Sequence, residues 1–387
     1  MQFTQEHEEL RRTVRNFVEK ELNPHVKEWE EAGRFPIHEV FKKMGDLGLL
    51  GVTKPTEFGG MGLDYSYGMV MAEEMGRTHC GGVPLSTGVQ TDMATPALAR
   101  FGSDELRQNY LAPAIAGDTV ASIAVSEPHA GSDVAAIKTT ATKDGDDYVI
   151  NGTKIWTSYA ALADHCFLLA RVGSGEAGSG SDRAGIAIFL VPMSTAGIQV
   201  RAIPSLIGHG DIHETFFTDV RIPATARLGA EGEGWSIIAY ALANERVGIP
   251  RYQLSARVLD GMVADLAARG RFDNPVIRSR AGAAFAACEA ARMLVYRVVD
   301  QRARGAAPGP ESNIARVAVI AADHAVTDFG LDFLPHSFSG DGVSTGGDPD
   351  LLAHHERAIV AGIAAGAAEI QLGLIARRHL DLPREAP

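Results

Sequence analysis

Two stretches in the middle of the chain decide the fold: VSEPHAGSD at residues 125–133 and NGTKIWTS at residues 151–158. The apolar run at 121–125 predicts a short strand that leads into the first stretch. The turn that follows offers hydroxyl groups and closely approachable backbone N–H groups, which suit a polar ring edge or an anion. A plain β-turn would explain the first stretch alone. The second stretch, in the same β-rich region, favours a binding site.

The spacing of apolar residues in the surrounding sequence changes twice. Before residue 118, apolar residues recur at three- and four-residue spacing, which predicts amphipathic helices. From 119 to 225, short β-branched or apolar runs alternate with turn residues, and Asn151-Gly152 is a typical hairpin signal. From 226 to 387 the helical spacing returns, with separate helices expected at 235–247 and 252–268 and a last one at 351–380. We therefore predict an α+β protein with domains at 1–118, 119–225 and 226–387.

Composition excludes several classes of protein. The 387 residues exceed the length at which single cores stop growing, and 45% of them are apolar, as in folded soluble proteins. A net charge of −12 argues against broad contact with nucleic acid or an anionic membrane. Three scattered cysteines indicate neither a disulfide framework nor a metal site. With no signal-peptide pattern at the start and no apolar run of membrane length, we expect a cytoplasmic protein.

Together the two stretches resemble the acyl-CoA dehydrogenase family, whose pattern is S/T-E-P-x-x-G-S-D followed by N-G-x-K-x-W-I-T/S. The resemblance covers most of the chain, because PTEFGGMGLD at 55–64, RFGS at 100–103 and VRIP at 220–223 are also similar to the family. It implies an N-terminal helical domain, a central β-barrel-like domain and a C-terminal four-helix bundle. It also implies FAD as the cofactor and assembly as a homodimer or homotetramer.

The same resemblance implies which residues hold the cofactor. Ser126 and Ser158 would hydrogen-bond the polar edge of the isoalloxazine, Val125 would contact it through its backbone, and Trp156 would pack against the rings. The set in this region is Val125, Ser126, Gly131, Ser132, Trp156 and Ser158, of which Ser132 is also assigned to the substrate.

Two further cofactor contacts are implied in the C-terminal third. The stretch RGRFDNP at 269–275 is similar to an R-x-x-F-G-x-P pattern by which a neighbouring subunit reaches the FAD pyrophosphate. Spacing favours Arg269 with Phe272 for that contact, and Arg271 stays an alternative, since either guanidinium can bind phosphate oxygens. Gly366 is assigned to the cofactor as well.

The catalytic base departs from the commoner family pattern. Many members carry the base in E-G-T-x-E-I-Q near the C-terminus, where this chain has Ala365. A subset carries it in a Glu-Arg pair on the helix after the β domain, which Glu245-Arg246 matches. We therefore assign Glu245 as the base and Arg246 to substrate binding, with Glu369 as the rival carboxylate and a kink expected at Pro250. A carboxylate in an apolar pocket can remove the weakly acidic proton next to a thioester.

The resemblance implies α,β-dehydrogenation of a saturated, medium-chain or branched acyl-CoA, with the β-hydride passing to flavin N5 and electrons then passing to an electron-transfer flavoprotein. Three alternatives stay open. The thioester could belong to an acyl carrier protein, the chain could be a non-catalytic subunit of a hetero-oligomer, or O₂ could be the electron acceptor. No nucleic-acid, membrane or metal partner is expected.

Overall fold

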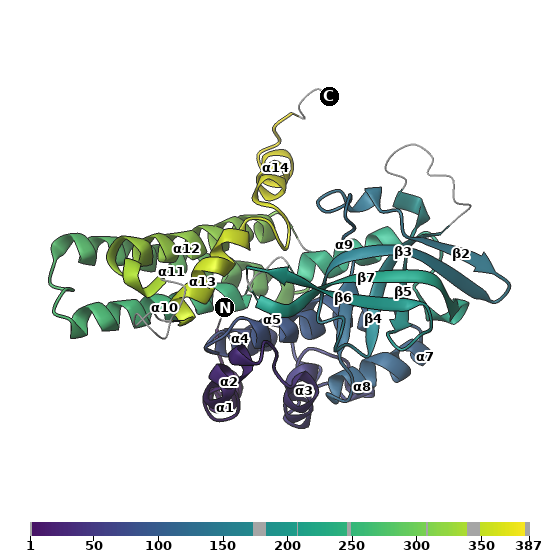
Figure 1. Cartoon of the computed structure of the whole chain (residues 1–387), viewed down its shortest axis with the longest axis horizontal. Coiled ribbons are helices and arrows are strands. Elements are labelled where there is room, and N and C mark those ends of the chain that lie inside the picture. The colour runs from purple at the N-terminus through teal and green to yellow at the C-terminus, as the bar shows by residue number, and fades with distance from the viewer. Residues whose placement is uncertain are drawn as a thin grey trace. The chain divides into compact units, whose positions relative to one another are not determined.

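The computed structural model describes residues 2–172, 183–206, 208–245, 249–306, 309–338 and 349–383. Helices come first, strands follow and helices return, which confirms the predicted α+β arrangement (Figure 1). The chain divides into two compact units, each made of several segments. The helical unit comprises Met1–Lys27, Asp64–Pro84 and Arg246–Pro387, and the sheet unit comprises Glu28–Leu63 and Leu85–Glu245. The domain limits expected at residues 118 and 225 stay a prediction.

Short helices precede the sheet. The α-helices are α1 (Gln5–Phe17), α2 (Val26–Glu31), α3 (Ile37–Asp46), α4 (Tyr65–Met75), α5 (Gly82–Gly88), α6 (Thr95–Phe101), α7 (Asp104–Leu106) and α8 (Ala112–Ile115). Three π-helical turns interrupt them: η1 (Val18–Leu22), η5 (Val89–Ala94) and η6 (Arg107–Leu111). None of the described helices has both the length and the apolar character needed to cross a bilayer.

The sheet unit is built on one sheet of eight strands. They are β1 (Ala121–Ala124), β2 (Thr140–Asp144), β3 (Asp147–Ser158), β4 (His165–Val172), β5 (Ile186–Pro192), β6 (Ile198–Ser205), β7 (Gly208–Pro223) and β8 (Arg227–Leu228). Neighbours follow the order β6-β7-β3-β2-β4-β5-β8, and β1 pairs with β4 in parallel. The described strands thus form an open sheet, whereas the resemblance implied a barrel-like one.

Strand β4 is buried on both faces, and its alternate side chains belong to two cores. Phe167 and Leu169 pack with η5, α6 and the helix α9 (Gly234–Glu245). Cys166 and Leu168 pack with side chains of β3 and β7. This period-two division is the usual one for a strand covered on both sides. It fixes η5, α6 and α9 against one face of the sheet.

The hairpin predicted at Asn151-Gly152 is wrong. Both residues lie inside β3, which pairs with β7 on either side of a register shift between Ile150 and Gly152. Glycine is required there because a Cβ on Gly152 would lie 2.4 Å from Thr139 Oγ1. The Asn-Gly pair therefore marks a bulge where Thr139, the residue before β2, approaches closely.

The helical unit contains a bundle of long helices. They are α10 (Ile249–Ala268), α11 (Pro275–Ala303), α12 (Glu311–Phe333), α13 (Pro349–Ala361) and α14 (Ala368–Arg378). Their core includes Leu259, Cys288, Val295 and Val319, and Met69 of α4 joins it. The single last helix predicted at 351–380 is wrong. It breaks at Ala365 (φ 56°) and Gly366 (φ 90°), because two consecutive left-handed residues cannot continue a right-handed helix.

A buried carboxylate pair ties the early helices to the bundle. Glu73 of α4 accepts hydrogen bonds from the hydroxyls of Tyr252 (2.5 Å) and Tyr296 (2.7 Å) and from the guanidinium of Arg11 (3.1 Å). Burial alone would raise the pKa of its neighbour Glu74, but the guanidinium groups of Arg15 and its neighbours lower that pKa below the ordinary value. Both carboxylates are thus satisfied within the helical unit.

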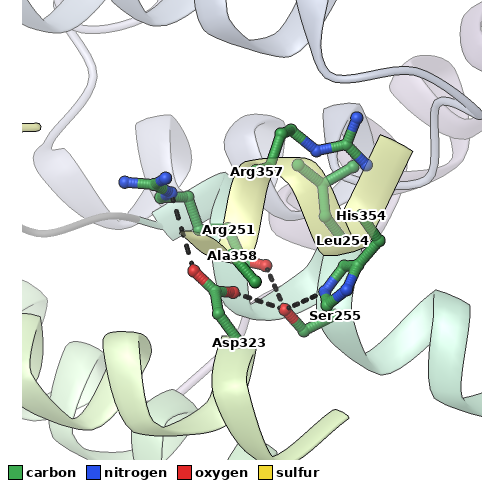
Figure 2. Close-up of a pocket in the computed structure, with 7 residues that line it drawn as sticks. All are labelled: Arg251, Leu254, Ser255, Asp323, His354, Arg357 and Ala358. Carbon is green, nitrogen blue, oxygen red and sulfur yellow. Dashed lines mark hydrogen bonds and ion pairs between the residues drawn. The ribbon is translucent and has the colours of Figure 1, made fainter. Parts of the chain in front are cut away.

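A second buried chain of hydrogen bonds joins α10, α12 and α13, and Figure 2 shows most of it. Ser255 Oγ lies 2.5 Å from Asp323 Oδ1 and 3.0 Å from His354 Nε2, while Thr327 Oγ1 lies 3.2 Å from His354 Nδ1. Because the hydroxyl of Ser255 has one proton and the carboxylate of Asp323 only accepts, Ser255 donates to Asp323. His354 Nε2 must then donate to Ser255, and burial keeps this ring neutral because it lowers the pKa of the imidazole to about 3. A small cavity beside the chain is lined by Arg251, Leu254, Ser255, Asp323, His354, Arg357 and Ala358.

We expect the buried imidazoles to make the fold sensitive to mild acid. Burial lowers the pKa of His165 to about 4 and that of His354 to about 3, from an ordinary value of 6.5. Below pH 6.5 the unfolded chain therefore binds more protons than the native chain, and the free energy of unfolding falls as pH falls. Urea unfolding between pH 7 and pH 5 measures this slope.

The variants His165→Gln and His354→Gln are the matched controls. Each keeps a neutral polar side chain and removes the titrating ring, so each should show a smaller loss of unfolding free energy over this pH range than the parent protein. If the unfolding free energy of both variants depended on pH as it does in the parent protein, the assignment of His165 and His354 as neutral in the native state would be contradicted.

Candidate functional site

Backbone hydrogen bonds hold the turn after β1 at both of its ends. Glu127 N–H donates to Ala130 O (2.9 Å), and Ala130 N–H donates back to Glu127 O (3.0 Å). Ser126 O accepts from the N–H of Ile155 on β3, at 2.9 Å. The two sequence stretches that predict the site are therefore joined by a direct backbone hydrogen bond.

A buried ion pair lies beneath this turn. Lys154 Nζ is 2.8 Å from Glu127 Oε1 and 3.0 Å from the carbonyl oxygen of Val125. The carboxylate of Glu127 also accepts from the N–H groups of Lys138 (2.6 Å) and Thr139 (2.9 Å). A single buried pair thus holds β3, the turn and the start of β2.

Burial opposes charge on both partners of this pair. Burial lowers the pKa of Lys154 to about 8, against the opposing effect of Glu127. For Glu127, burial would raise the pKa, but Lys154 and the two backbone donors lower it below the ordinary value. Both groups are therefore charged near neutral pH, and each depends on the other for its stability.

Trp156 stands out at the bulge next to this pair. The register of β3 against β7 shifts between Lys154 and Thr157, and Trp156 adopts a φ of 61°. This left-handed conformation is costly for a bulky side chain, and the residue is nevertheless 54% exposed. A strained residue with an exposed ring contributes little to the core, so a ligand-facing role explains it better.

The remaining predicted residues of the sheet unit lie nearby in the chain. Gly131 and Ser132 are exposed in the same turn, and a Cβ added to Gly131 would meet no atom within 4 Å. Packing within the described residues therefore does not require glycine there, whereas a ligand lying against the turn would. Ser158 is half-buried at the end of β3, two positions beyond Trp156.

Helix α9 belongs to the same unit as this turn. Its Ile237, Ile238 and Ala241 share a core with Val125. Gly234 lets the helix begin close to β5, since a Cβ there would lie 2.2 Å from the carbonyl oxygen of Ile186. The helix ends at Glu245, whose side chain lies outside the described part of the structure, as do Arg246 and the kink expected beside it. The roles of both residues stay predictions.

The cofactor residues predicted in the C-terminal third of the sequence lie in the helical unit. Arg269 follows α10 with its side chain 57% exposed, and its Nε donates to Asp265 at 2.9 Å. Arg271 instead donates to the carbonyl oxygen of Phe333 (3.0 Å), and Phe272 packs against the bundle core. Both arginines are exposed, and the choice of Arg269 over Arg271 stays a prediction.

Gly366 lies in the loop between α13 and α14. This loop is held by Arg316 of α12, which is fully buried and donates to the carbonyl oxygens of Ala361 and Ala364. Asn313 donates to Gln371 at the start of α14, at 2.5 Å.

The sequence patterns did not single out Arg316 or the pair Glu127–Lys154. The available signal for that pair was the glutamate in the first quoted stretch and the lysine in the second.

We expect removal of one partner of the ion pair to cost more than removal of both. Lys154→Met leaves Glu127 buried without its cation, which should lower the free energy of unfolding by about 3–5 kcal/mol. The double variant Glu127→Gln/Lys154→Met keeps shape without charge and should recover part of that loss. Chemical unfolding of the parent protein, Glu127→Gln, Lys154→Met and the double variant measures these free energies. Additive losses would contradict a coupled pair.

Comparison with known proteins agrees with this geometry. The family described as "Acyl-CoA dehydrogenase, N-terminal domain" matches residues 4–118, the corresponding middle domain matches 122–220 and the C-terminal domain matches 232–380. The short-chain specific mitochondrial acyl-CoA dehydrogenase of Bos taurus is 32% identical over 387 residues, covering 97% of this chain and 90% of that protein.

Solved structures give the same result. An acyl-CoA dehydrogenase from Geobacillus kaustophilus superposes with a TM-score of 0.86 at 26% identity, covering 98% of this chain and 99% of that one. A chain from work on the electron transferring flavoprotein of Acidaminococcus fermentans has a TM-score of 0.88 at 25% identity, covering 98% and 99%. The chain therefore belongs to the acyl-CoA dehydrogenase family, whose members are FAD-dependent oxidoreductases acting on acyl-CoA.

Proposed function

We propose that this chain dehydrogenates a saturated acyl-CoA, with a medium-chain or branched acyl group, to the trans-2-enoyl thioester. The observation that supports it best is the fastened turn after β1 beside the exposed, strained Trp156. An electron-transfer flavoprotein is the proposed acceptor, which the likeness to the Acidaminococcus chain supports. Homodimeric or homotetrameric assembly and a cytoplasmic location stay predictions.

The residues of the site fit FAD. The hydroxyls of Ser126 and Ser158 and the backbone of Val125 are assigned to the polar edge of the flavin, and Trp156 to its ring face. The open space around Gly131 fits a flat ligand lying close to the turn. FAD, when bound, supplies the acceptor for the hydride that leaves the β-carbon. The buried pair beneath the turn keeps the binding groups in place without reaching the ligand.

Glu245 is proposed to take the α-proton. It is the last residue of α9, the helix that follows the sheet. A carboxylate is a group that can act as general base toward the proton next to a thioester. Arg246 and Ser132 are proposed to bind the thioester substrate. Ala365, at the other family position, has no group that can accept a proton.

Replacing the proposed base should separate cofactor binding from chemistry. Glu245→Gln is expected to keep its flavin but to be reduced about 10²–10⁴-fold more slowly by acyl-CoA, because the amide cannot accept the α-proton. Anaerobic bleaching of the visible flavin band by a panel of acyl-CoA thioesters measures the rate. Glu369→Gln is the matched control and should reduce at the parent rate.

Other outcomes of that experiment identify the alternatives. Reduction of Glu245→Gln at the parent rate would exclude Glu245 as the base. A parent protein that holds flavin but is bleached by no acyl-CoA would favour an acyl-carrier-protein substrate. A parent protein without flavin would favour a non-catalytic subunit, and peroxide formation during turnover would favour an oxidase.

The two arginines after α10 should differ in their effect on the cofactor. Arg269→Ala removes a charge-assisted contact to phosphate and should weaken FAD binding about 10–100-fold. Arg271→Ala removes the hydrogen bond to Phe333 and should lower stability while leaving FAD affinity unchanged. Fluorescence titration of each apoprotein variant with FAD measures the two affinities. The reverse pattern would transfer the pyrophosphate contact to Arg271.

A further inference from the structure

The π-helical turn η5 connects the two halves of the candidate site. It packs against β1, whose end leads into Val125 and Ser126, and against α9, which ends at Glu245. Its fully buried Gln90 accepts from the N–H of Ala121 (2.8 Å) and donates to the carbonyl oxygens of Ala114 (3.1 Å) and Thr119 (2.9 Å). The amide of Gln90 thus sets where β1 begins.

The hydrogen bonds of η5 leave the carbonyl oxygen of Thr91 without the usual backbone donor. The hydroxyl of Thr95 lies 3.4 Å from this oxygen but 2.6 Å from Gln90 O, which takes its single proton. In a π-helical turn each carbonyl accepts from the N–H five residues ahead, and Thr95 N–H does donate to Gln90 O. The next such bond would run from residue 96 to Thr91 O, but residue 96 is proline and has no N–H. A buried carbonyl in this position needs a donor from elsewhere.

Lys54 supplies that donor. Its Nζ lies 2.8 Å from Thr91 O and 3.1 Å from Thr53 Oγ1. Only 3% of the residue is exposed, and burial lowers the pKa of its amine to about 8 despite the nearby charge of Asp92. The backbone of Lys54 is fixed as well, since Gly62 N–H donates to its carbonyl oxygen at 2.8 Å.

We propose that Lys54 is a positioning residue for the dehydrogenation, and that it acts by holding η5 between β1 and α9. This inference rests on the proposed function, because it concerns the distance between the flavin edge and the base. Loss of the α-proton and of the β-hydride requires both acceptors to be aligned with the same bond of the substrate. A shift of η5 would move one acceptor relative to the other without removing either.

A double-mutant cycle with Pro96 tests the proposal. Lys54→Met should slow anaerobic flavin reduction at saturating acyl-CoA about 10–100-fold, at unchanged flavin content, because small misplacements of reacting groups have effects of that size. Pro96→Ala restores an N–H for Thr91 O, so Lys54→Met/Pro96→Ala should reduce close to the parent rate. Lys54→Gln keeps a donor and should be intermediate.

Two results would overturn the inference. One is reduction of Lys54→Met at the parent rate while only its stability falls, which would make Lys54 purely structural. The other is no recovery in the double variant. Should Lys54→Met fail to fold, Lys54→Gln with and without Pro96→Ala gives the same cycle.

The proposed function and this inference can fail separately. If no acyl-CoA bleaches the parent flavin, the function fails, and the position of η5 is then read from amide hydrogen exchange at Ala121. Faster exchange in Lys54→Met that returns to the parent value in the double variant supports the role of Lys54 in holding η5. Unchanged exchange overturns it.

Discussion

The rest of the candidate site depends on the buried ion pair between Lys154 and Glu127. Bringing both charges out of water is costly, and the cost is offset only because the carboxylate accepts two backbone N–H groups and the amine also reaches Val125 O. A neutral core could be equally stable, but it would not specify which backbone groups meet. Here the pair fixes the turn after β1 to β3, so Ser126 and Trp156 occupy defined positions before any ligand arrives. Preorganisation of this kind reduces the entropy that binding must overcome.

Much of the fold could be predicted because its signals are local. The helical spacing and the short β-branched runs predict the order of elements, and the structure confirms it. The failures are of one kind, where pairing or packing overrides a local preference. Asn151-Gly152 has the chemistry of a hairpin, yet the long partner strand β7 and the close approach of Thr139 keep it inside β3. The break at Ala365 and Gly366 is similar, because Ala is a good helix former and Arg316 holds the loop through distant carbonyl groups.

The residues predicted for the candidate site are those that lie in recognisable stretches of sequence. Val125, Ser126 and Trp156 follow from the two quoted stretches, and the structure joins those stretches. Lys54 and Gln90 could not be found this way, since their partners are backbone carbonyl and N–H groups that every residue possesses. The need for Lys54 arises only when the π-helical turn and Pro96 coincide, and no spacing rule indicates that turn. Buried polar side chains with backbone partners are therefore the part of a site that sequence patterns miss most easily.

The division of the chain into interleaved units has a consequence for synthesis on the ribosome. The helical unit needs Met1–Lys27 and Asp64–Pro84 together with Arg246–Pro387, so its first helices emerge long before their partners. Until then Glu73 has neither Tyr252 nor Tyr296, and the apolar face of α4 has no bundle to cover it. The sheet unit can fold while this surface is still exposed. Nascent chains should therefore require chaperone protection of α1 and α4 until translation has passed α11.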